Sequence, residues 1–250
     1  MSISVCMASY NGENFIEKQI KSILLQLSSS DELIIVDDCS TDRTVERINA
    51  FKDSRIQLVQ NISNSGEILS FSKAISLSKN KYIFLSDQDD IWITGRVKLM
   101  IDSLEESKSH LVTSNFSWIN DDDLPIDIEF DGVFSSASNK NLKNILDIFI
   151  GKTNYFGCAM LFKRELIPII CPIPRFVESH DLWIAFISNI LKSNLHIEEH
   201  TFLKRKHNSN VTSTISNRPI SKKLFSRVIF LLSILLIYKR FYFKKFFKLT

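Results

Sequence analysis

Short apolar runs alternate with amphipathic stretches along the first 92 residues. Runs rich in β-branched residues predict buried strands at residues 3–7, 32–36, 56–60 and 82–85. Between these runs, apolar residues recur at helical spacing, which predicts helices over residues 14–27, 44–51 and 68–78. Strands that alternate with helices in this rhythm form a mostly parallel sheet with helices on both faces. The predicted class is therefore α/β.

The pattern is less regular from residue 93 onward. It predicts helices over residues 96–106, 139–150 and 178–191, and strands over residues 111–115 and 156–163. Residues 209–220 are polar and carry little pattern, so we predict a hinge there. A folded domain over residues 1–208 would then be followed by a tail over residues 221–250.

Polar side chains follow three of the predicted strands at the points where these strands end. Tyr10 and Asn11 follow the first strand, Asp37 and Asp38 follow the second, and residues 87–90 follow the fourth. In open parallel sheets, ligands bind beyond the carboxyl ends of the strands. The sequence therefore predicts a ligand site at this edge of the sheet.

The segment SDQDDIW, residues 86–92, places the carboxylates Asp87, Asp89 and Asp90 within four positions. Such crowding of negative charge is unfavourable unless a positive charge lies between the carboxylates. A divalent cation that prefers oxygen ligands, Mg²⁺ or Mn²⁺, would satisfy this need. An acidic surface turn is the alternative, and the position of the cluster at the end of a buried strand argues against it.

Three blocks of the sequence resemble the signature segments of the family 2 glycosyltransferases. They read VCMASYNGENFIEKQIKSILLQ, DELIIVDDCSTDRT and KYIFLSDQDDIW. Two later segments, HDLW at residues 180–183 and RKHNSN at residues 205–210, resemble motifs of the bacterial rhamnosyltransferase-like branch. Each block alone is a weak signal, but five blocks in this order form a specific one.

The resemblance implies a GT-A fold, a Rossmann-like and mostly parallel sheet flanked by helices. The residues after it add a C-terminal amphipathic helical tail. It divides residues 1–208 into a nucleotide-binding half, residues 1–92, and an acceptor-binding half, residues 93–208. The implied activity is inverting transfer of a sugar from a nucleotide-diphosphate donor, dTDP-rhamnose or a UDP-sugar. The implied acceptor is a saccharide or lipid-linked saccharide used in bacterial surface polysaccharide synthesis.

The resemblance also assigns nucleotide-binding roles. Ala8 and Tyr10 would border the base, with Tyr10 lying against its ring. Asp38 would accept a hydrogen bond from the base, with Asp37 beside it. Cys39 stands where the family often has glycine, which narrows the backbone freedom of that turn.

Metal binding is a further implied role. Asp87 and Asp89 would form the D-x-D motif, with Asp89 the direct ligand of Mn²⁺ or Mg²⁺ and Asp87 also at the nucleotide. The ion would neutralise the diphosphate leaving group. His207 would reach the diphosphate or the metal, and a solvated basic loop at this position remains the alternative.

Asp181 would be the general base, because an acceptor hydroxyl becomes a good nucleophile as its proton is removed. A carboxylate that accepts backbone N–H groups at a helix N-terminus is the alternative. His180 would orient the acceptor or cap the helix. Asp90, Trp92 and Trp183 complete the implied sugar and acceptor site, with core packing as the alternative for both tryptophans.

Charge is divided unevenly along the chain. Residues 201–250 hold twelve Lys and Arg and no acid, which leaves 19 basic and 28 acidic residues in the first 200 positions. An acidic body with a basic tail is not typical of a nucleic-acid-binding fold, so we expect no nucleic-acid partner. Anionic lipid is the simplest partner for such a tail.

The tail contains the apolar run FSRVIFLLSILLIY, residues 225–238, flanked by lysine and arginine. A spanning helix needs roughly 20 apolar residues, and this run has fewer that are free of charge. We therefore predict a basic helix that lies in the membrane interface, in a cytoplasmic protein that is peripheral on the inner face of the plasma membrane. A helix packed on the domain, or one that docks a partner, is the alternative.

Two other functions compete with sugar transfer. A nucleotidyltransferase would need a glycine-rich loop with basic residues after the first strand, and the segment SYNGEN lacks this signature. A catalytically silent membrane-bound binding protein would not need Asp38, Asp89 and Asp181 together. The four cysteines are widely spaced without a C-x-x-C pair, which predicts free thiols and argues against a structural zinc site.

Overall fold

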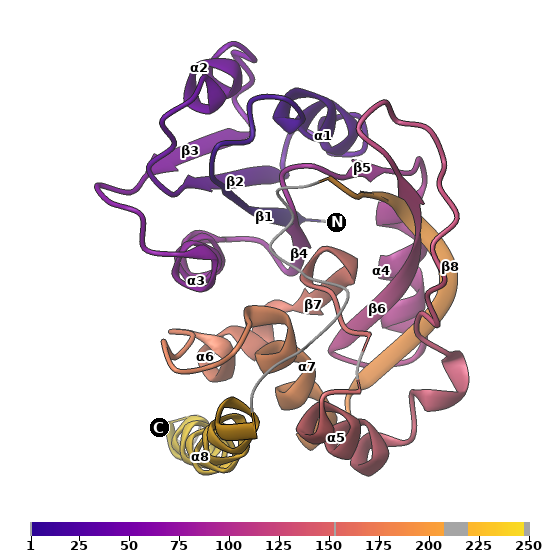
Figure 1. The fold of residues 1–250 in the computed structure, drawn as a ribbon. Coiled ribbons are helices and arrows are strands. Elements are labelled where there is room, and N and C mark those ends of the chain that lie inside the picture. Colours follow the sequence, from indigo (N-terminus) through magenta and orange to yellow (C-terminus); the bar gives the residue numbers. More distant parts are fainter. Residues whose placement is uncertain (1, 153, 208–219, 248–250) are drawn as a thin grey trace.

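The computed structural model describes residues 2–152, 154–207 and 220–247 (Figure 1). Its centre is an eight-stranded sheet in the order β3-β2-β1-β4-β7-β6-β8-β5. The pairs among β1 to β4 are parallel, whereas β7 pairs antiparallel with both β4 and β6. Helices cover both faces of the sheet (Figure 1). The predicted α/β class is therefore confirmed.

The N-terminal half follows the prediction closely. Its strands and helices are β1 (Ile3–Ser9), α1 (Ile16–Leu24), β2 (Glu32–Asp37), α2 (Thr44–Asn49), β3 (Ile56–Gln60), α3 (Glu67–Leu77) and β4 (Tyr82–Ser86). The register pairs Ser9 with Asp37 and Met7 with Ser86. The carboxyl ends of β1, β2 and β4 consequently meet at one edge of the sheet.

The C-terminal half contains elements that the sequence pattern missed. Its main elements are β5 (Ile91–Trp92), α4 (Arg96–Glu106), β6 (Leu111–Ile119), α5 (Asn141–Ile150), β7 (Met160–Lys163), α6 (Ile167–Ile170), α7 (His180–Ile190) and β8 (Asn194–Arg205). Neither β5 nor β8 was predicted. The prediction of a strand from residue 156 was too long, because a short 3-10 helix (Gly157–Ala159) precedes β7.

The sequence pattern does not predict β8, because a bulge interrupts the alternation of buried and exposed residues along this strand. His196 pairs with Thr113 and His200 with Asn115, so the register shifts between them. Glu198 and Glu199 lie in the bulge and are exposed. An extra exposed segment of this kind breaks the period-two pattern by which a strand is recognised.

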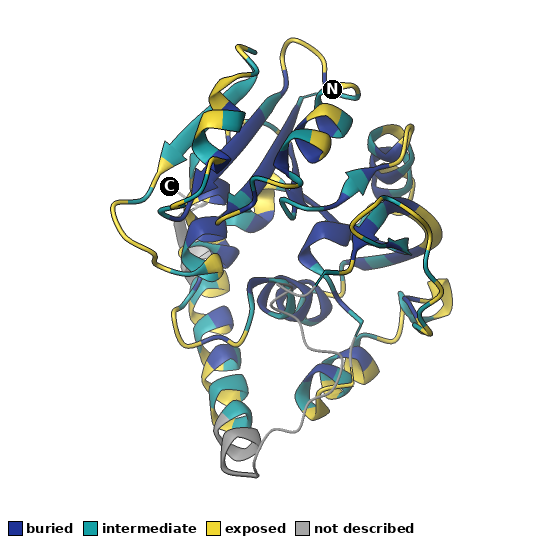
Figure 2. Cartoon of the chain, turned by 45° about the horizontal axis from the view of Figure 1, so that its top comes forward, coloured by how far each residue is buried: buried dark blue, intermediate teal, exposed yellow. Residues whose placement is uncertain are grey.

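Two hydrophobic cores lie on opposite faces of the sheet. Successive side chains of a strand point to opposite faces, so Val5 and Met7 join one core and Cys6 joins the other. Helices α1 and α4 cover the first core, and α3, α6 and α7 cover the second. Figure 2 shows the strands buried between these helices, whose outer faces are exposed.

The C-terminal helix α8 (Ile220–Phe247) lies along α6 and α7 (Figure 1). Phe230 stacks against Phe186 of α7 with ring centroids 4.3 Å apart, and Ile237 is fully buried. Arg240 donates hydrogen bonds to the carbonyl oxygens of Ile169 and Pro172. The inner face of α8 therefore packs on the domain. This packing was the alternative to the predicted helix in the membrane interface.

The outer face of α8 is exposed over the part of the helix whose burial is described, as Figure 2 shows. Its large exposed side chains are Val228, Leu231, Leu232, Leu235, Tyr238, Phe241 and Tyr242. Among the described residues, none of the helices combines the length and the apolar character needed to cross a membrane. The hinge predicted at residues 209–220 lies outside the described residues except for Ile220, where α8 begins.

The two faces of α8 differ in how much they contribute to stability. Replacing the fully buried Ile237 by alanine should lower the free energy of unfolding by about 2–4 kcal/mol, because it removes packed methyl groups and leaves a cavity. Leu235, which is 68% exposed on the same helix, is the matched control, and its replacement by alanine should change stability by less than about 0.5 kcal/mol. Urea denaturation followed by circular dichroism measures both. Equal losses in the two variants would contradict the packing of α8 on the domain.

Candidate active site

Asp37 fixes the turn that follows β2. Its carboxylate accepts hydrogen bonds from Ser9 Oγ at 3.0 Å and from the Ser40 backbone N–H at 2.9 Å. Within this turn, Cys39 has a left-handed backbone conformation with φ of 68°, which glycine adopts most easily. Asp37 is buried, so it supports the turn rather than facing open solvent.

Asp38 is also buried and holds the loop that leads into α3. It accepts hydrogen bonds from Asn61 Nδ2 at 2.8 Å and from the backbone N–H groups of Ser65 and Gly66 at 2.9 and 2.7 Å. Burial works against ionisation of Asp38, but these hydrogen bonds outweigh it and lower the pKa of the carboxyl. Asp38 is thus a charged acceptor at the carboxyl end of β2.

Gln88, which the sequence reasoning did not single out, ties the carboxylate segment to the loop after β1. Its side chain accepts a hydrogen bond from the Tyr10 backbone N–H and donates one to the Tyr10 carbonyl oxygen, both at 3.0 Å. A Cβ atom at Gly12 would lie 2.2 Å from Gln88 Oε1, so glycine is needed for this approach. The side chain of Tyr10 itself is 46% exposed, and Ala8 is half-buried beside it on β1.

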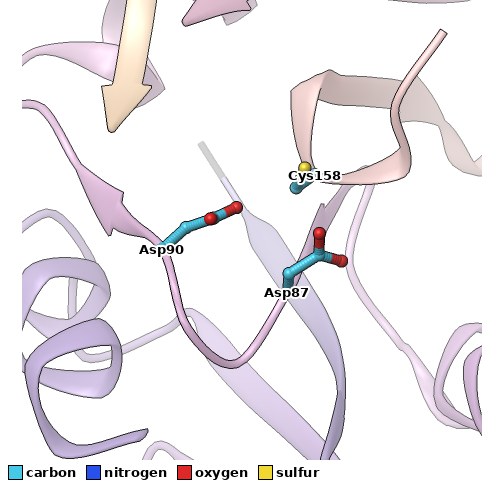
Figure 3. Close-up of side chains that lie close together, drawn as sticks. All are labelled: Asp87, Asp90 and Cys158. Atoms are coloured by element: carbon cyan, nitrogen blue, oxygen red, sulfur yellow. The ribbon is translucent and has the colours of Figure 1, made fainter. Parts of the chain in front are cut away.

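The carboxyl groups of Asp87 and Asp90 point toward a common space with the thiol of Cys158 (Figure 3). Asp87 follows β4, Asp90 precedes β5, and Cys158 comes from the short 3-10 helix before β7. One ligand atom from each of the three lies within 4.8 Å of the others. Asp90 is only 1% exposed, and its Oδ2 atom is buried without a hydrogen-bond partner among the described residues.

A lysine, which the sequence reasoning did not place here, contacts all three of these groups. Lys204 Nζ lies 2.9 Å from Asp87 Oδ2, 3.3 Å from Cys158 Sγ and 3.9 Å from Asp90 Oδ2. We expected a divalent cation among the carboxylates of residues 86–92, and the ligand atoms of Asp87, Asp90 and Cys158 do lie close enough together to hold a metal ion. The structure also places a protein ammonium group between Asp87 and Asp90, which supplies positive charge there.

The pKa values of these groups follow from their mutual contacts. Burial alone would lower the pKa of Lys204, but Asp87 and Asp90 raise it well above its ordinary value, so the side chain is charged. Burial opposes ionisation of Asp87, yet Lys204 lowers the pKa of this carboxyl. Burial raises the pKa of Asp90 to about 7, with Lys204 acting against the rise and Asp89 and Asp87 adding to it.

Asp89 turns away from this cluster and meets His207 instead. His207 Nε2 lies 2.7 Å from Asp89 Oδ2, and the imidazole ring rests near Phe15 with ring centroids 5.0 Å apart. The structure therefore brings together Asp89 and His207, two of the three residues that the sequence placed at the metal, whereas Asp87 lies with Asp90 and Cys158. A solvated basic loop does not describe His207, because its side chain is 12% exposed.

Arg205 fastens the end of β8 to the carboxylate segment. Its backbone N–H donates to Asp90 Oδ1 at 3.1 Å, and its Nε donates to the Asp89 carbonyl oxygen at 2.9 Å. Its guanidinium also pairs with Asp123 at 2.5 Å and lies over the ring of Phe15. Since Arg205 is fully buried, these contacts provide the partners that a buried charge requires.

The donor atoms at this edge fit a divalent metal ion in their chemistry. Asp89 offers carboxylate oxygens and His207 offers an imidazole nitrogen, and both are ligand types that Mn²⁺ accepts. The space between Asp87 and Asp90 fits less well, because Lys204 already contacts both carboxylates. The fit is therefore better on the side of Asp89 and His207.

Asp181 lies in the first turn of α7, and Glu67 links it electrostatically to the carboxylates of the strand end. Burial raises the pKa of Glu67, His180 and Lys204 lower it, and Asp87 and Asp181 raise it further. The pKa of Glu67 on α3 therefore responds to charges on α7, on β8 and at the end of β4. Glu67 is a site residue that the sequence reasoning missed.

His180 is buried between α3 and the short 3-10 helix. Its ring stacks on Phe71 with centroids 4.0 Å apart, and its Nδ1 lies 3.2 Å from Glu67 Oε1. A Cβ atom at Gly157 would lie 2.4 Å from His180 Nε2, so only glycine permits this packing. The residue that precedes α7 is Ser179, and no side-chain hydrogen bond caps the helix, which excludes the capping role for His180.

Both tryptophans belong to the hydrophobic cores, as in the packing alternative. Trp92 is buried against Phe84 and beneath the guanidinium of Arg96. Trp183 is buried in the other core, and its Nε1 donates to the Ile170 carbonyl oxygen at 3.0 Å. Both side chains are therefore core residues, and Trp183 also lines the hollow between α7 and α8.

The site includes residues that only the tertiary structure reveals. Lys204 and Glu67 look like ordinary surface charges in the sequence, and Cys158 looks like a core residue. The sequence did contain a hint that Gln88 belongs to the site, because this residue lies inside the segment SDQDD among the candidate carboxylates.

Comparison with known proteins agrees with this architecture. The family model described as glycosyl transferase family 2 matches residues 4–168. The UDP-Glc:alpha-D-GlcNAc-diphosphoundecaprenol beta-1,3-glucosyltransferase WfaP of Escherichia coli is 34% identical over 191 residues, which cover 76% of this chain and 72% of WfaP. WfgD of Escherichia coli carries the same activity in its name and is 28% identical over 220 residues, 86% of this chain and 80% of WfgD.

Among solved structures, TarS 1-349 of S. aureus in complex with UDP-GlcNAc superposes with a TM-score of 0.71 at 18% identity. The match covers 94% of this chain and 67% of TarS 1-349. In another crystal structure of TarS 1-349, the match covers 60% of the TarS chain. At this identity the likeness shows the fold, which is GT-A. The match of the family model and the identity to WfaP place the chain in the family, so it belongs to glycosyltransferase family 2 and is a glycosyltransferase.

Proposed function

We propose that this chain transfers a sugar, with inversion, from a nucleoside-diphosphate donor to a saccharide carried on a lipid diphosphate, in the synthesis of a bacterial surface polysaccharide. The observation that carries the proposal is that Asp38 and Asp87 follow β2 and β4 directly, at the carboxyl ends of the two strands that flank β1, in a chain of this family. A UDP-sugar is favoured over dTDP-rhamnose, because the names of WfaP and WfgD both specify UDP-Glc. The same names specify an acceptor on diphosphoundecaprenol.

The nucleotide of the donor is assigned to the ends of β1 and β2. Tyr10 is exposed there and offers its ring to the base, and Ala8 leaves room beside it. Asp38 is a charged acceptor, and among the described residues its Oδ2 accepts a hydrogen bond from the Gly66 N–H alone, so it retains capacity for a base N–H. Asp37 holds the turn on which Asp38 depends.

A divalent ion, Mn²⁺ or Mg²⁺, is assigned to Asp89 together with His207, which lie 2.7 Å apart. When bound there, the ion would neutralise charge that develops on the departing diphosphate. Asp87 remains next to the nucleotide, where its carboxylate pairs with Lys204. Asp90 supports the loop through the Arg205 backbone N–H.

The general base is assigned to Asp181. Its Oδ1 accepts the Leu182 backbone N–H at 2.7 Å, which fixes the carboxylate in the first turn of α7. Within the described part of the chain, no group donates to its Oδ2, which leaves this oxygen to take the proton of an acceptor hydroxyl. His180 and Glu67 lie beside it and border the acceptor side of the site.

The outer face of α8 is assigned to the membrane surface. It presents a stripe of exposed apolar side chains that includes Leu231 and Leu235, in a tail that contains no acidic residue. Apolar side chains with basic neighbours suit the boundary between headgroups and acyl chains. In this proposal residues 1–208 form the catalytic domain on the cytoplasmic face, and α8 holds it beside its lipid-linked acceptor.

Donor identity can be tested by thermal unfolding in the presence of Mn²⁺ and a panel of nucleotide-sugars. UDP-glucose should raise the melting temperature by several degrees, because a ligand that binds only the folded state stabilises it. GDP-mannose serves as the control and should give no shift. A larger shift with dTDP-rhamnose than with any UDP-sugar would contradict the donor assignment.

The two assigned carboxylates can be tested by isosteric replacement. Asp89→Asn and Asp181→Asn should each lower the rate of sugar transfer by about a hundredfold or more, because each removes a charge that acts on a reacting group. Asp121→Asn, a change at an exposed aspartate, is the matched control and should retain the wild-type rate. Near-normal transfer by both variants, with the fold intact by circular dichroism, would refute the assignment.

Membrane attachment can be tested by flotation with anionic phospholipid vesicles. Leu231→Glu combined with Leu235→Glu should abolish flotation, because charge on the stripe opposes insertion into the acyl region. Leu142→Glu combined with Leu146→Glu places the same charges on exposed leucines of α5 and should leave flotation unchanged. If only the α5 pair released the protein, α8 would not be the attachment helix.

A further inference from the structure

Lys204 is the charged residue of the site to which the proposed reaction gives no task. It lies near the end of β8, and its side chain is 8% exposed. Its ammonium group contacts Asp87, Asp90 and Cys158 at 2.9, 3.9 and 3.3 Å. In the described part of the chain, those three residues are the one group whose His, Cys, Asp or Glu ligand atoms converge closely enough for a metal ion.

The backbone around Lys204 fixes its side chain in this position. Ser117 pairs with Leu203 and Trp118 with Lys204 in the register between β6 and β8, and Ile91 of β5 pairs with Leu203 on the other side. The next residue, Arg205, donates its backbone N–H to Asp90. Lys204 Nζ also lies 5.5 Å from the ring of Phe156. Paired strands on both sides therefore hold the ammonium among the carboxylates.

A divalent ion at Asp87 and Asp90 would meet this ammonium at close range. Like charges a few ångströms apart in a partly buried site repel strongly, because little water lies between them to screen the interaction. The two carboxylates also gain less from a metal, since Lys204 already neutralises part of their charge. Asp89 acts on Lys204 less strongly than Asp87, Asp90 or Cys158 does, so an ion at Asp89 and His207 meets less of this competition.

We infer that Lys204 is an internal cation that competes with divalent metal for the Asp87 and Asp90 carboxylates and lowers the affinity of the free protein for the metal. The carboxylate cluster is thereby kept folded without a metal ion, and metal binding is directed to the side of Asp89 and His207. This inference rests on the proposed metal site, but it concerns binding of the ion alone and requires neither donor nor turnover.

The test measures binding of Mn²⁺ alone to the full chain, by the loss of the electron paramagnetic resonance signal of free aqueous Mn²⁺. Lys204→Met removes the charge and retains an unbranched chain, and it should bind Mn²⁺ at least about tenfold more tightly than the wild type. Lys206→Met removes a charge two residues away on an exposed side chain, and it should bind within about threefold of the wild type. Lys204→Arg, which keeps the charge, should also resemble the wild type.

Lys204→Gln provides a second neutral variant in case methionine disturbs the fold, and circular dichroism checks the folding of each protein. The inference is overturned if the folded neutral variants bind Mn²⁺ no more tightly than Lys206→Met, or if they lose the binding that the wild type shows. Failure of the proposed sugar transfer would appear in the donor and turnover experiments and would leave this comparison of Mn²⁺ affinities unchanged.

Discussion

The structure depends on one electrostatic constraint, which is that three carboxylates at the end of β4 require positive charge close by. The chain supplies it from the end of β8, where Lys204 pairs with Asp87 and Arg205 binds the backbone and carboxylate of residues 89–90. His207, which follows β8, meets Asp89 through a ring nitrogen. Because these partners lie more than a hundred residues apart in sequence, the contacts close the C-terminal half over the nucleotide half. The antiparallel pairing of β5 with β8 joins the same two parts of the chain.

The sequence predicted the N-terminal half well, because its strands and helices follow one another with local and regular hydrophobic periods. It also predicted which strand ends carry polar side chains, since adjacent parallel strands share one edge. It missed β8, where a bulge at exposed glutamates breaks the alternation, and β5, which is two residues long. It did not place Lys204 among these carboxylates, because a lysine's partner across the sheet leaves no trace in the spacing of residues.

Helix α7 connects the two functional regions that we propose. Its first turn carries His180 and Asp181 at the site, and its later turns pack against α8, where Phe186 stacks on Phe230. The proposed base and the proposed membrane-facing helix are therefore parts of one rigid unit. Such an arrangement would present Asp181 at a fixed height above a lipid surface, which suits an acceptor whose sugar is held near the headgroups by its own lipid.

The central claim is a single displacement at the anomeric carbon, driven by one base on the face opposite the leaving diphosphate. The anomeric configuration of the product tests it most directly. Proton NMR of the saccharide formed from an α-linked UDP-glucose donor and a short lipid-diphosphate acceptor should show the large anomeric coupling of a β-linkage, with one equivalent of UDP released. An α-linked product, or the absence of any glycosidic product when UDP is released, would contradict the account.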